Sequence, residues 1–180
     1  MQILKIKNYL LLGEKTADSK LAPTLQDYIF GLELSGKHSW DRTKFLNNFL
    51  LEEAKRIFEL RKEVLIGNAK KNKDGKILYL YLDAKTKKEI TEPKEGTSYQ
   101  FEDVQKLNDD LNELLNDEYV IDVTPANSRL IDNVRTAMEN DNIKYSGMDS
   151  ARLSLYFEAM EPQSAEIGKK EEKKEEKEEK

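Results

Sequence analysis

The stretch SWDRTKFLNNFLLEEAKRIFELRKEVLI, residues 39–66, decides the fold of this chain. Apolar side chains recur along it at the three- and four-residue spacing of an α-helix, with charged side chains between them. The apolar positions are Leu46, Phe49, Leu50, Ile57, Leu60, Val64 and Leu65. Ser39 suits the position before a helix, Asp41 its first turn and Gly67 the position after its end. We therefore expect one long amphipathic helix over residues 39–66, which forms the spine of the domain.

The segment before this helix predicts a shorter helix and a strand. Helical spacing relates Leu21, Leu25, Tyr28, Ile29 and Leu32. Proline suits the first turn of a helix, so we expect a helix that begins at Pro23 and ends before the Ser35-Gly36-Lys37 turn. The tight connection makes this helix the antiparallel partner of the long one. Residues 1–7 carry Ile3, Leu4 and Ile6 and predict a short strand.

The segments after the long helix predict a small sheet and further helices. Residues 77–82, ILYLYL, are an unbroken apolar and aromatic run that is too short for a helix and rich in tyrosine, which predicts a strand. Weaker strand signals at 89–91 and 98–101 would complete a small antiparallel sheet or hairpin. Helical spacing returns at 102–116, 128–139 and 148–160, with a strand at 119–123. Because helices and hairpin strands are segregated, we expect an α+β fold rather than a doubly wound parallel sheet.

The end of the chain carries charge and no apolar residue. Residues 169–180 read KKEEKKEEKEEK, which is six lysines and six glutamates. A charged single helix needs opposite charges four residues apart, but most such pairs here are alike, as are Lys169 and Lys173. We therefore expect a single α+β domain over residues 1–161 and a charged, disordered tail over residues 162–180.

The composition argues against several classes of protein. The chain has no cysteine and one histidine, His38, which excludes disulfides, thiolate metal sites and multi-histidine metal centres. No apolar run reaches the roughly 18–20 residues of a membrane helix. No glycine-rich phosphate loop and no G-x-S-x-G turn occurs. We therefore expect no enzyme activity, no cofactor, no metal ion and no membrane partner.

One local cluster, His38-Ser39-Trp40-Asp41-Arg42, permits two interpretations. A catalytic interpretation pairs His38 with a carboxylate as a general base. The structural interpretation, which we favour, places His38 and Ser39 at the helix start, packs Trp40 on the preceding helix and leaves Arg42 on the surface.

A second local pattern, residues 72–75, resembles the start of a calcium loop. The sequence there is Asn-Lys-Asp-Gly, but a lysine intrudes and the downstream bidentate glutamate is missing. We therefore expect a plain turn.

Charge is strongly separated along a chain whose net charge is −5. Residues 67–94 hold eight lysines against four acidic residues, and residues 95–123 hold nine acidic residues against one lysine. The candidate basic patch consists of Lys73, Lys76, Lys85, Lys87 and Lys88. The candidate partner-binding surface consists of Asp109, Asp110, Glu113 and Asp117. Separated charges of this kind favour a partner that is bound electrostatically on one face.

Five segments together carry a resemblance. Residues 34–39 form a Leu-x-Gly-Lys-x-Ser turn after a short helix, residues 43–65 a long charged helix, and residues 70–76 a Lys/Asp/Gly turn. Residues 101–115 begin with Phe-x-Asp and continue as an acidic helix, and residues 120–122 form a Val-x-Ile-Asp-like strand. In this pattern the chain resembles an uncharacterised family of small phage and prophage proteins of Gram-positive bacteria. The family usually has Ser-Arg-x-Arg at the start of the long helix, whereas this chain retains only Arg42.

The resemblance implies a phage accessory or structural protein, of a kind often encoded near tail-fibre and lysis genes, and it implies no known activity. We therefore expect a non-enzymatic protein that acts by protein–protein interaction in the virion, the tail or their assembly. Its partner would be a phage structural protein, a second copy of itself or a host protein. It would be found in the host cytoplasm or in the virion.

Two alternative functions remain open. The first is a phage inhibitor that binds a host defence protein through the acidic face. The second is weak nucleic-acid binding through the Lys-rich hairpin, which we do not favour because the hairpin has no arginine for bidentate base recognition and the whole domain is acidic.

Overall fold

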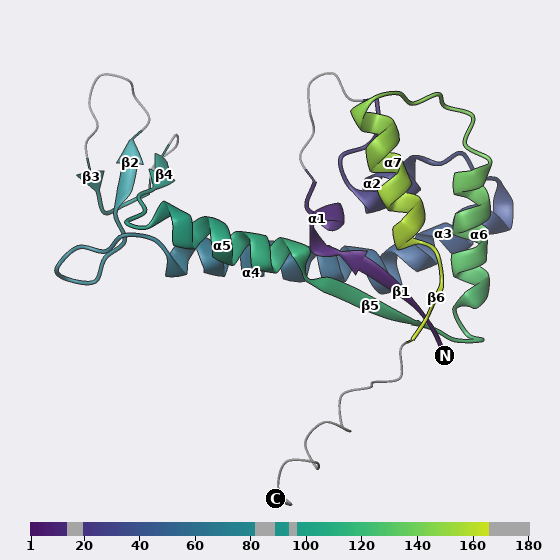
Figure 1. Ribbon diagram of the computed structural model, residues 1–180, viewed down its shortest axis with the longest axis horizontal. Coiled ribbons are helices and arrows are strands. Elements are labelled where there is room, and N and C mark those ends of the chain that lie inside the picture. The colour runs from purple at the N-terminus through teal and green to yellow at the C-terminus, as the bar shows by residue number, and fades with distance from the viewer. Residues whose placement is uncertain (14–19, 82–88, 94–96, 166–180) are drawn as a thin grey trace, which may run out of the picture.

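The computed structural model describes residues 1–13, 20–81, 89–93 and 97–165. This part of the chain has two regions, a body built on a three-stranded sheet and an arm of two helices that ends in a second small sheet (Figure 1). Long helices combined with small antiparallel sheets confirm the α+β fold. One helical rod passes through both regions and joins them.

The rod consists of α3 (Gly36–Phe45), the π-helical turn η1 (Leu46–Leu50) and α4 (Leu51–Gly67). It confirms the long helix expected over residues 39–66, although Ser39 is not its cap. The helix begins at Gly36 after an extended Ser35, so that Ser39 lies inside it and its carbonyl accepts a bond from the Thr43 hydroxyl at 3.0 Å. Gly67 is its last residue rather than the residue that follows its end.

The π turn changes which face of the rod is buried. The Leu51 N–H donates to the carbonyl of Leu46, five residues earlier, as a π turn requires. In a regular α-helix, side chains five residues apart point about 140° away from each other. Phe45 and Leu50 are five residues apart and both are fully buried. The turn therefore lets α3 and α4 bury different faces of one continuous rod.

Two short helices precede the rod, α1 (Asn8–Leu11) and α2 (Leu25–Gly31). α2 is the expected partner of the long helix and packs against α3 and η1. It is shorter than the range 23–34 that its spacing predicts. Thr24 is its N-cap, because its hydroxyl accepts a bond from the Asp27 N–H at 3.1 Å, and this leaves Pro23 outside the helix. At the other end, Leu32 is already extended.

The sheet of the body has the order β5-β1-β6 and is antiparallel throughout. β1 (Gln2–Lys7) and β5 (Glu118–Val123) pair along their whole lengths, with Leu4 opposite Ile121. β6 (Gln163–Ser164) pairs with the other edge of β1. The folded part therefore extends past the predicted boundary at residue 161, because these two residues cover a strand edge. Of the expected tail, residues 166–180 lie outside the described residues.

The main core lies between this sheet, the rod and two later helices, α6 (Ser128–Glu139) and α7 (Met148–Ala159). Both helices confirm the predicted ranges to within a residue. The side chains that are buried at its centre come from all of these elements and include Leu4, Ile6, Phe45, Leu50, Ile131, Val134 and Tyr156.

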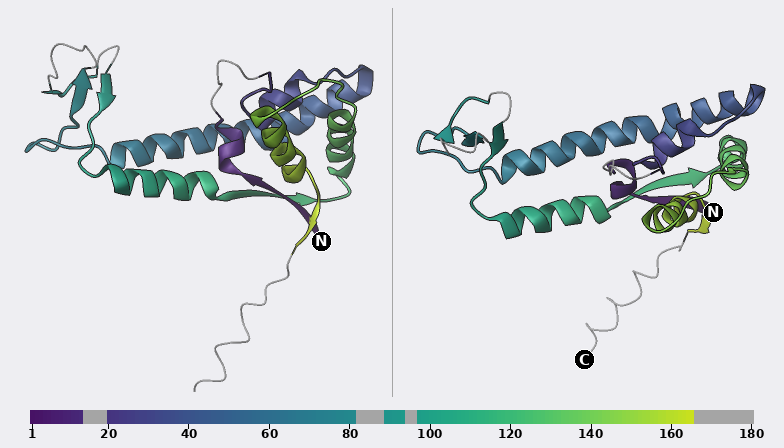
Figure 2. Two further views of the ribbon diagram at one scale, coloured as in Figure 1. Left: turned by 45° about the horizontal axis from the view of Figure 1, so that its top comes forward. Right: turned by 90° about the horizontal axis from the view of Figure 1, so that it is seen from above.

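The arm is formed by α4 and by α5 (Val104–Asn116), which runs back beside it in the opposite direction (Figure 2). At its far end lies the second sheet, of order β3-β2-β4, formed by β2 (Tyr79–Tyr81), β3 (Glu89–Ile90) and β4 (Thr97–Tyr99). Only Ile57 of α4 and Leu107 of α5 are buried. Most of the surface of both helices is therefore in contact with water.

Candidate interaction surface on the helical arm

An acidic ridge runs along the outer surface of α5. Asp103 begins the helix by accepting a bond from the Lys106 N–H at 2.9 Å. Asp109 and Glu113 are four residues apart, so they share one face of the helix, and Asp117 follows at the helix end with the same spacing. All three are exposed. We call Asp109, Glu113 and Asp117 the acidic ridge.

Asp110, the fourth predicted residue of this surface, has a different position. It is half-buried, and its Oδ2 accepts a hydrogen bond from the Asn68 side chain at 2.8 Å. The same Asn68 nitrogen donates to the carbonyl of Val64 at 3.0 Å. Asp110 therefore fastens α5 to the end of α4 and does not belong to the acidic ridge. Its sequence neighbour Asp109 points another way because consecutive helical residues do not share a face.

The expected basic patch is described only in part. Lys73 and Lys76 are exposed in a tight turn, in which the Asn72 side-chain oxygen accepts bonds from the N–H groups of Asp74 and Lys76, each at 2.9 Å. Gly75 has φ +77°, a conformation that glycine adopts without strain. The plain turn expected at residues 72–75 is confirmed. Lys85, Lys87 and Lys88 lie outside the described residues.

The arm also exposes apolar side chains. Phe58 of α4 is 55% exposed, Val104 of α5 is 58% exposed, and Leu51 is 38% exposed. Leu51 and Phe58 are seven residues apart and so lie on the same side of α4, next to the buried side that carries Ile57. The seven-residue spacing of Leu51 and Phe58 is visible in the sequence, but their exposure follows from the arm having only two helices.

The cluster at the start of the rod has a structural role that differs from the predicted one. Asp41 is fully buried, and it accepts bonds from Arg129 at 3.0 Å and from Asn133 at 2.6 Å, both on α6. Arg42 is not a free surface residue, because its guanidinium donates to the carbonyls of Phe30 and Leu32 at the end of α2.

Trp40, expected to pack on the preceding helix, is 52% exposed. The Lys44 ammonium lies 3.9 Å from the centre of its ring. The lysine, on the next turn of the same helix, therefore forms a cation–π contact with the indole.

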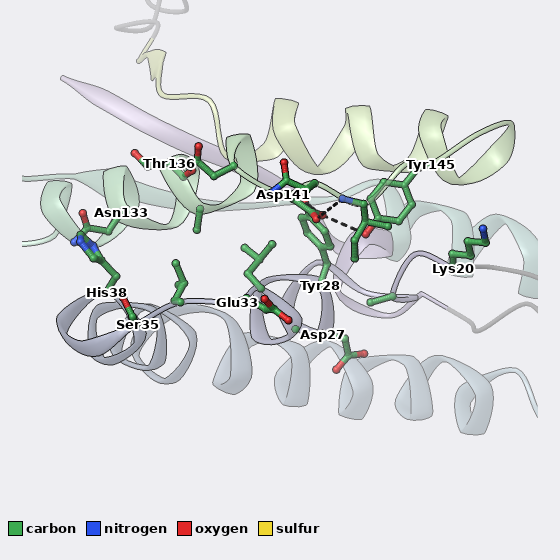
Figure 3. A pocket seen from close by; sticks show the side chains of 18 residues that line it. Lys20, Asp27, Tyr28, Glu33, Ser35, His38, Asn133, Thr136, Asp141 and Tyr145 are labelled. Atoms are coloured by element: carbon green, nitrogen blue, oxygen red, sulfur yellow. Dashed lines mark hydrogen bonds between the residues drawn. The ribbon is translucent and has the colours of Figure 1, made fainter.

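A cavity of about 670 Å³ lies between α2, α6 and the connections that follow them (Figure 3). Tyr28 and Tyr145 both donate to Oδ2 of Asp141, at 3.1 and 3.2 Å, and the Ile143 N–H donates to the other oxygen. Burial, and then the Asp141 charge, raise the pKa of both phenols, that of Tyr145 to about 12. At neutral pH both phenols are therefore hydrogen-bond donors that hold the α6–α7 connection against α2.

His38 lines the same cavity near Asn133. Within the part of the chain that the structure describes, neither a hydrogen bond nor an ion pair joins His38 to a carboxylate. The structure therefore does not form the pair of histidine and carboxylate that a catalytic interpretation requires.

The described residues contain no group of histidine, aspartate and glutamate side chains arranged to hold a metal ion, and no helix among them is long and apolar enough to cross a bilayer. The chain was also compared with known proteins. No family model, curated protein or solved structure matches it.

Proposed function

We propose that this protein is a non-enzymatic protein-binding protein whose partner binds the helical arm. The observation that carries the proposal is that the arm, which carries the acidic ridge on α5, also exposes Leu51, Phe58 and Val104 to water. Large apolar side chains that gather on an exposed surface are typical of protein interaction sites. Among the described residues, the four-residue helix α1 also packs against α4 and α5, and it leaves these side chains exposed.

The acidic ridge gives this surface its selectivity. Asp109 and Glu113 are exposed and have no cationic partner among the described residues. Charges of one sign on a projecting element speed the approach of a partner of opposite charge and disfavour partners of like charge. A basic protein surface is therefore the preferred partner.

The proposal that the protein acts in a phage rests on the resemblance of residues 34–122 to the phage and prophage family. Under this proposal it is an accessory or structural protein of the virion, the tail or their assembly. The alternative, an inhibitor of a host defence protein, uses the same acidic ridge and differs only in the origin of the partner.

The test is a pair of charge reversals with equal change in charge. In Asp109→Lys/Glu113→Lys the acidic ridge is reversed, whereas Asp132→Lys/Glu139→Lys reverses two exposed acids on α6. Tagged proteins capture partners from purified virions and, separately, from host lysate, and mass spectrometry identifies what is bound. Light scattering after size exclusion detects self-association.

The first variant should lose its partner while the second keeps it, and circular dichroism should show both to be folded. A partner from virions supports the structural role, and a host enzyme supports the inhibitor. Equal capture by both variants would show that the ridge is not the binding surface.

A further inference from the structure

One edge of the sheet in the body has no neighbouring strand. β5 is paired with β1 on one side only, and it forms the border of the sheet (Figure 1). Among the described residues, no backbone hydrogen bond joins β5 to a segment other than β1. An uncovered edge presents free N–H and C=O groups, to which the extended chain of a partner can add as a further strand.

The register of the sheet decides which backbone groups of β5 point outward. The Asn8 N–H donates to the carbonyl of Asp117 at 3.0 Å, directly before the first residue pair of the two strands. Hydrogen-bonded and non-hydrogen-bonded pairs alternate along an antiparallel ladder. The pairs that bond to β1 therefore contain residues 119, 121 and 123, and the backbone groups of Glu118, Val120 and Asp122 point away from β1.

Side chains cover both ends of this outward edge. The Glu118 N–H donates to the Asp117 carboxylate at 2.9 Å, and the Asp122 carbonyl accepts a bond from the Asn127 side chain at 2.8 Å. The outward groups between these two have no such partner among the described residues. They are the Glu118 carbonyl, the N–H and carbonyl of Val120, and the Asp122 N–H. The open part of the edge is therefore centred on Val120, whose side chain is 47% exposed.

The side chains on this part of β5 indicate which chain would fit. Glu118, Val120 and Asp122 share one face of the strand and are exposed. Glu118 pairs with Lys7 at 2.8 Å and with Lys5 at 3.7 Å, whereas Asp122 has no ion pair with a described residue. A second copy, paired through Val120, would place Glu118 opposite Asp122, and like charges directly opposite each other are destabilising. A basic residue opposite Asp122 avoids this.

We propose that the partner adds an extended basic segment to β5 as a further antiparallel strand, with an apolar residue opposite Val120 and a lysine or arginine two residues earlier, opposite Asp122. This inference rests on the proposed function only in taking the partner to be a basic protein. The sheet is antiparallel throughout, and antiparallel pairs are slightly more stable than parallel ones. Asp117 of the acidic ridge directly precedes β5, so one basic partner can contact both.

The probe is a short peptide, acetyl-Thr-Lys-Thr-Val-Thr-Thr-Thr-amide, added to the full chain labelled with ¹⁵N. It should shift the amide signals of Val120 and Asp122 in a saturable way. It should bind at least about threefold more tightly than the same peptide with glutamate in place of lysine. N-methylation of its valine should weaken binding at least about fivefold, because this N–H bonds to the Val120 carbonyl. N-methylation of the threonine before it should have little effect, since that N–H points away from β5.

Variants of the chain test the same contacts from the other side. Val120→Pro removes the outward N–H at an edge position, where proline is tolerated, and it should abolish peptide binding, whereas Val120→Thr should keep it. Asp122→Asn should remove the preference for lysine over glutamate. Equal affinity for the two N-methylated peptides would overturn the proposal even if Val120→Pro does not fold. So would the absence of shifts at Val120 and Asp122 with millimolar peptide, or a self-association that Val120→Pro abolishes, which would make a second copy the occupant.

The outcome also separates this inference from the proposed function. Asp109→Lys/Glu113→Lys should still bind the probe peptide, because these two residues lie on α5 and contribute no group to the edge of β5. If folded Val120→Pro still captures the partner that the charge reversal loses, the acidic ridge is the binding surface and the added strand is refuted.

Discussion

Replacing Asp41 by alanine should lower the free energy of unfolding by about 3 kcal/mol, because two hydrogen bonds to a buried carboxylate are lost and each is worth about 1.5–3 kcal/mol. Two effects reduce the sum. Arg129 is 55% exposed, so water weakens its share, and alanine is the better helix former by roughly 0.5 kcal/mol. The Asn133 amide, left half-buried without its acceptor, adds to the loss.

A double-mutant cycle measures this contact directly. Urea unfolding followed by circular dichroism gives the free energy of unfolding for Asp41→Ala, Asn133→Ala and the double variant. The coupling energy between the two residues should be at least about 1 kcal/mol, since the pair is in direct contact. Asp132→Ala is the matched control: it removes an exposed acid from α6 and should cost less than about 0.5 kcal/mol.

Two results would refute this reasoning. The first is a cost for Asp41→Ala no larger than that of Asp132→Ala. The second is a coupling energy near zero, which would mean that Asn133 does not bond to Asp41 in solution. Asp41→Asn removes the charge and keeps the shape of the side chain. It should still cost about 1.5–2 kcal/mol, because an amide has one oxygen and can accept from only one of the two donors, Arg129 or Asn133.

On α4, neighbouring substitutions should differ sharply: Ile57→Ala, at a fully buried position, should cost about 3 kcal/mol in urea unfolding, and Phe58→Ala less than about 1 kcal/mol. Equal costs would show that Phe58 is covered. The pKa values of Tyr28, Tyr145 and Tyr156 are raised in the folded protein, so the unfolded chain loses these protons first as the pH rises. Their contribution to the free energy of unfolding is therefore fully present below pH ~10 and decreases as the pH rises toward the pKa values of the folded state. Tyr28→Phe/Tyr145→Phe should flatten this decline in urea titrations between pH ~10 and ~12, and an unchanged slope would contradict it.

Much of the fold could be predicted because each element has a local signal. Apolar spacing identified the rod, α6 and α7, although it did not show that the π turn in the rod changes the buried face. The ILYLYL run identified β2, although only Tyr79–Tyr81 pair as a strand. The ends of α2 were harder, because Pro23 and Thr24 compete to begin the helix and the capping bond of Thr24 decides.

The contacts between distant segments had no such signal. From the sequence, Asp41 is predicted to lie in the first turn of a helix. Its actual role comes from its bond to Arg129 of α6, which lies 88 positions later in the chain. Asp110 belongs with Asp109 in the sequence but is separated from it by its bond to Asn68. β6 is a two-residue strand whose sequence gives no strand signal. It is a strand because Gln163 and Ser164 pair with the edge of β1 that β5 does not cover. In each case a tertiary contact overrides a local pattern.

The division into body and arm also decides how the charge reversals can be interpreted. Asp109 and Glu113 lie on the water-facing side of α5, whose only fully buried residue is Leu107, and the main core contains no residue of α5. A substitution on the outer side of the arm therefore changes neither the core nor the Asp41 contact, and effects at sites this far apart should add. Loss of a partner in Asp109→Lys/Glu113→Lys with unchanged urea unfolding would then report on the surface alone. Loss of both together would mean that the packing of α5 on α4 depends on charge as well as on burial of Leu107.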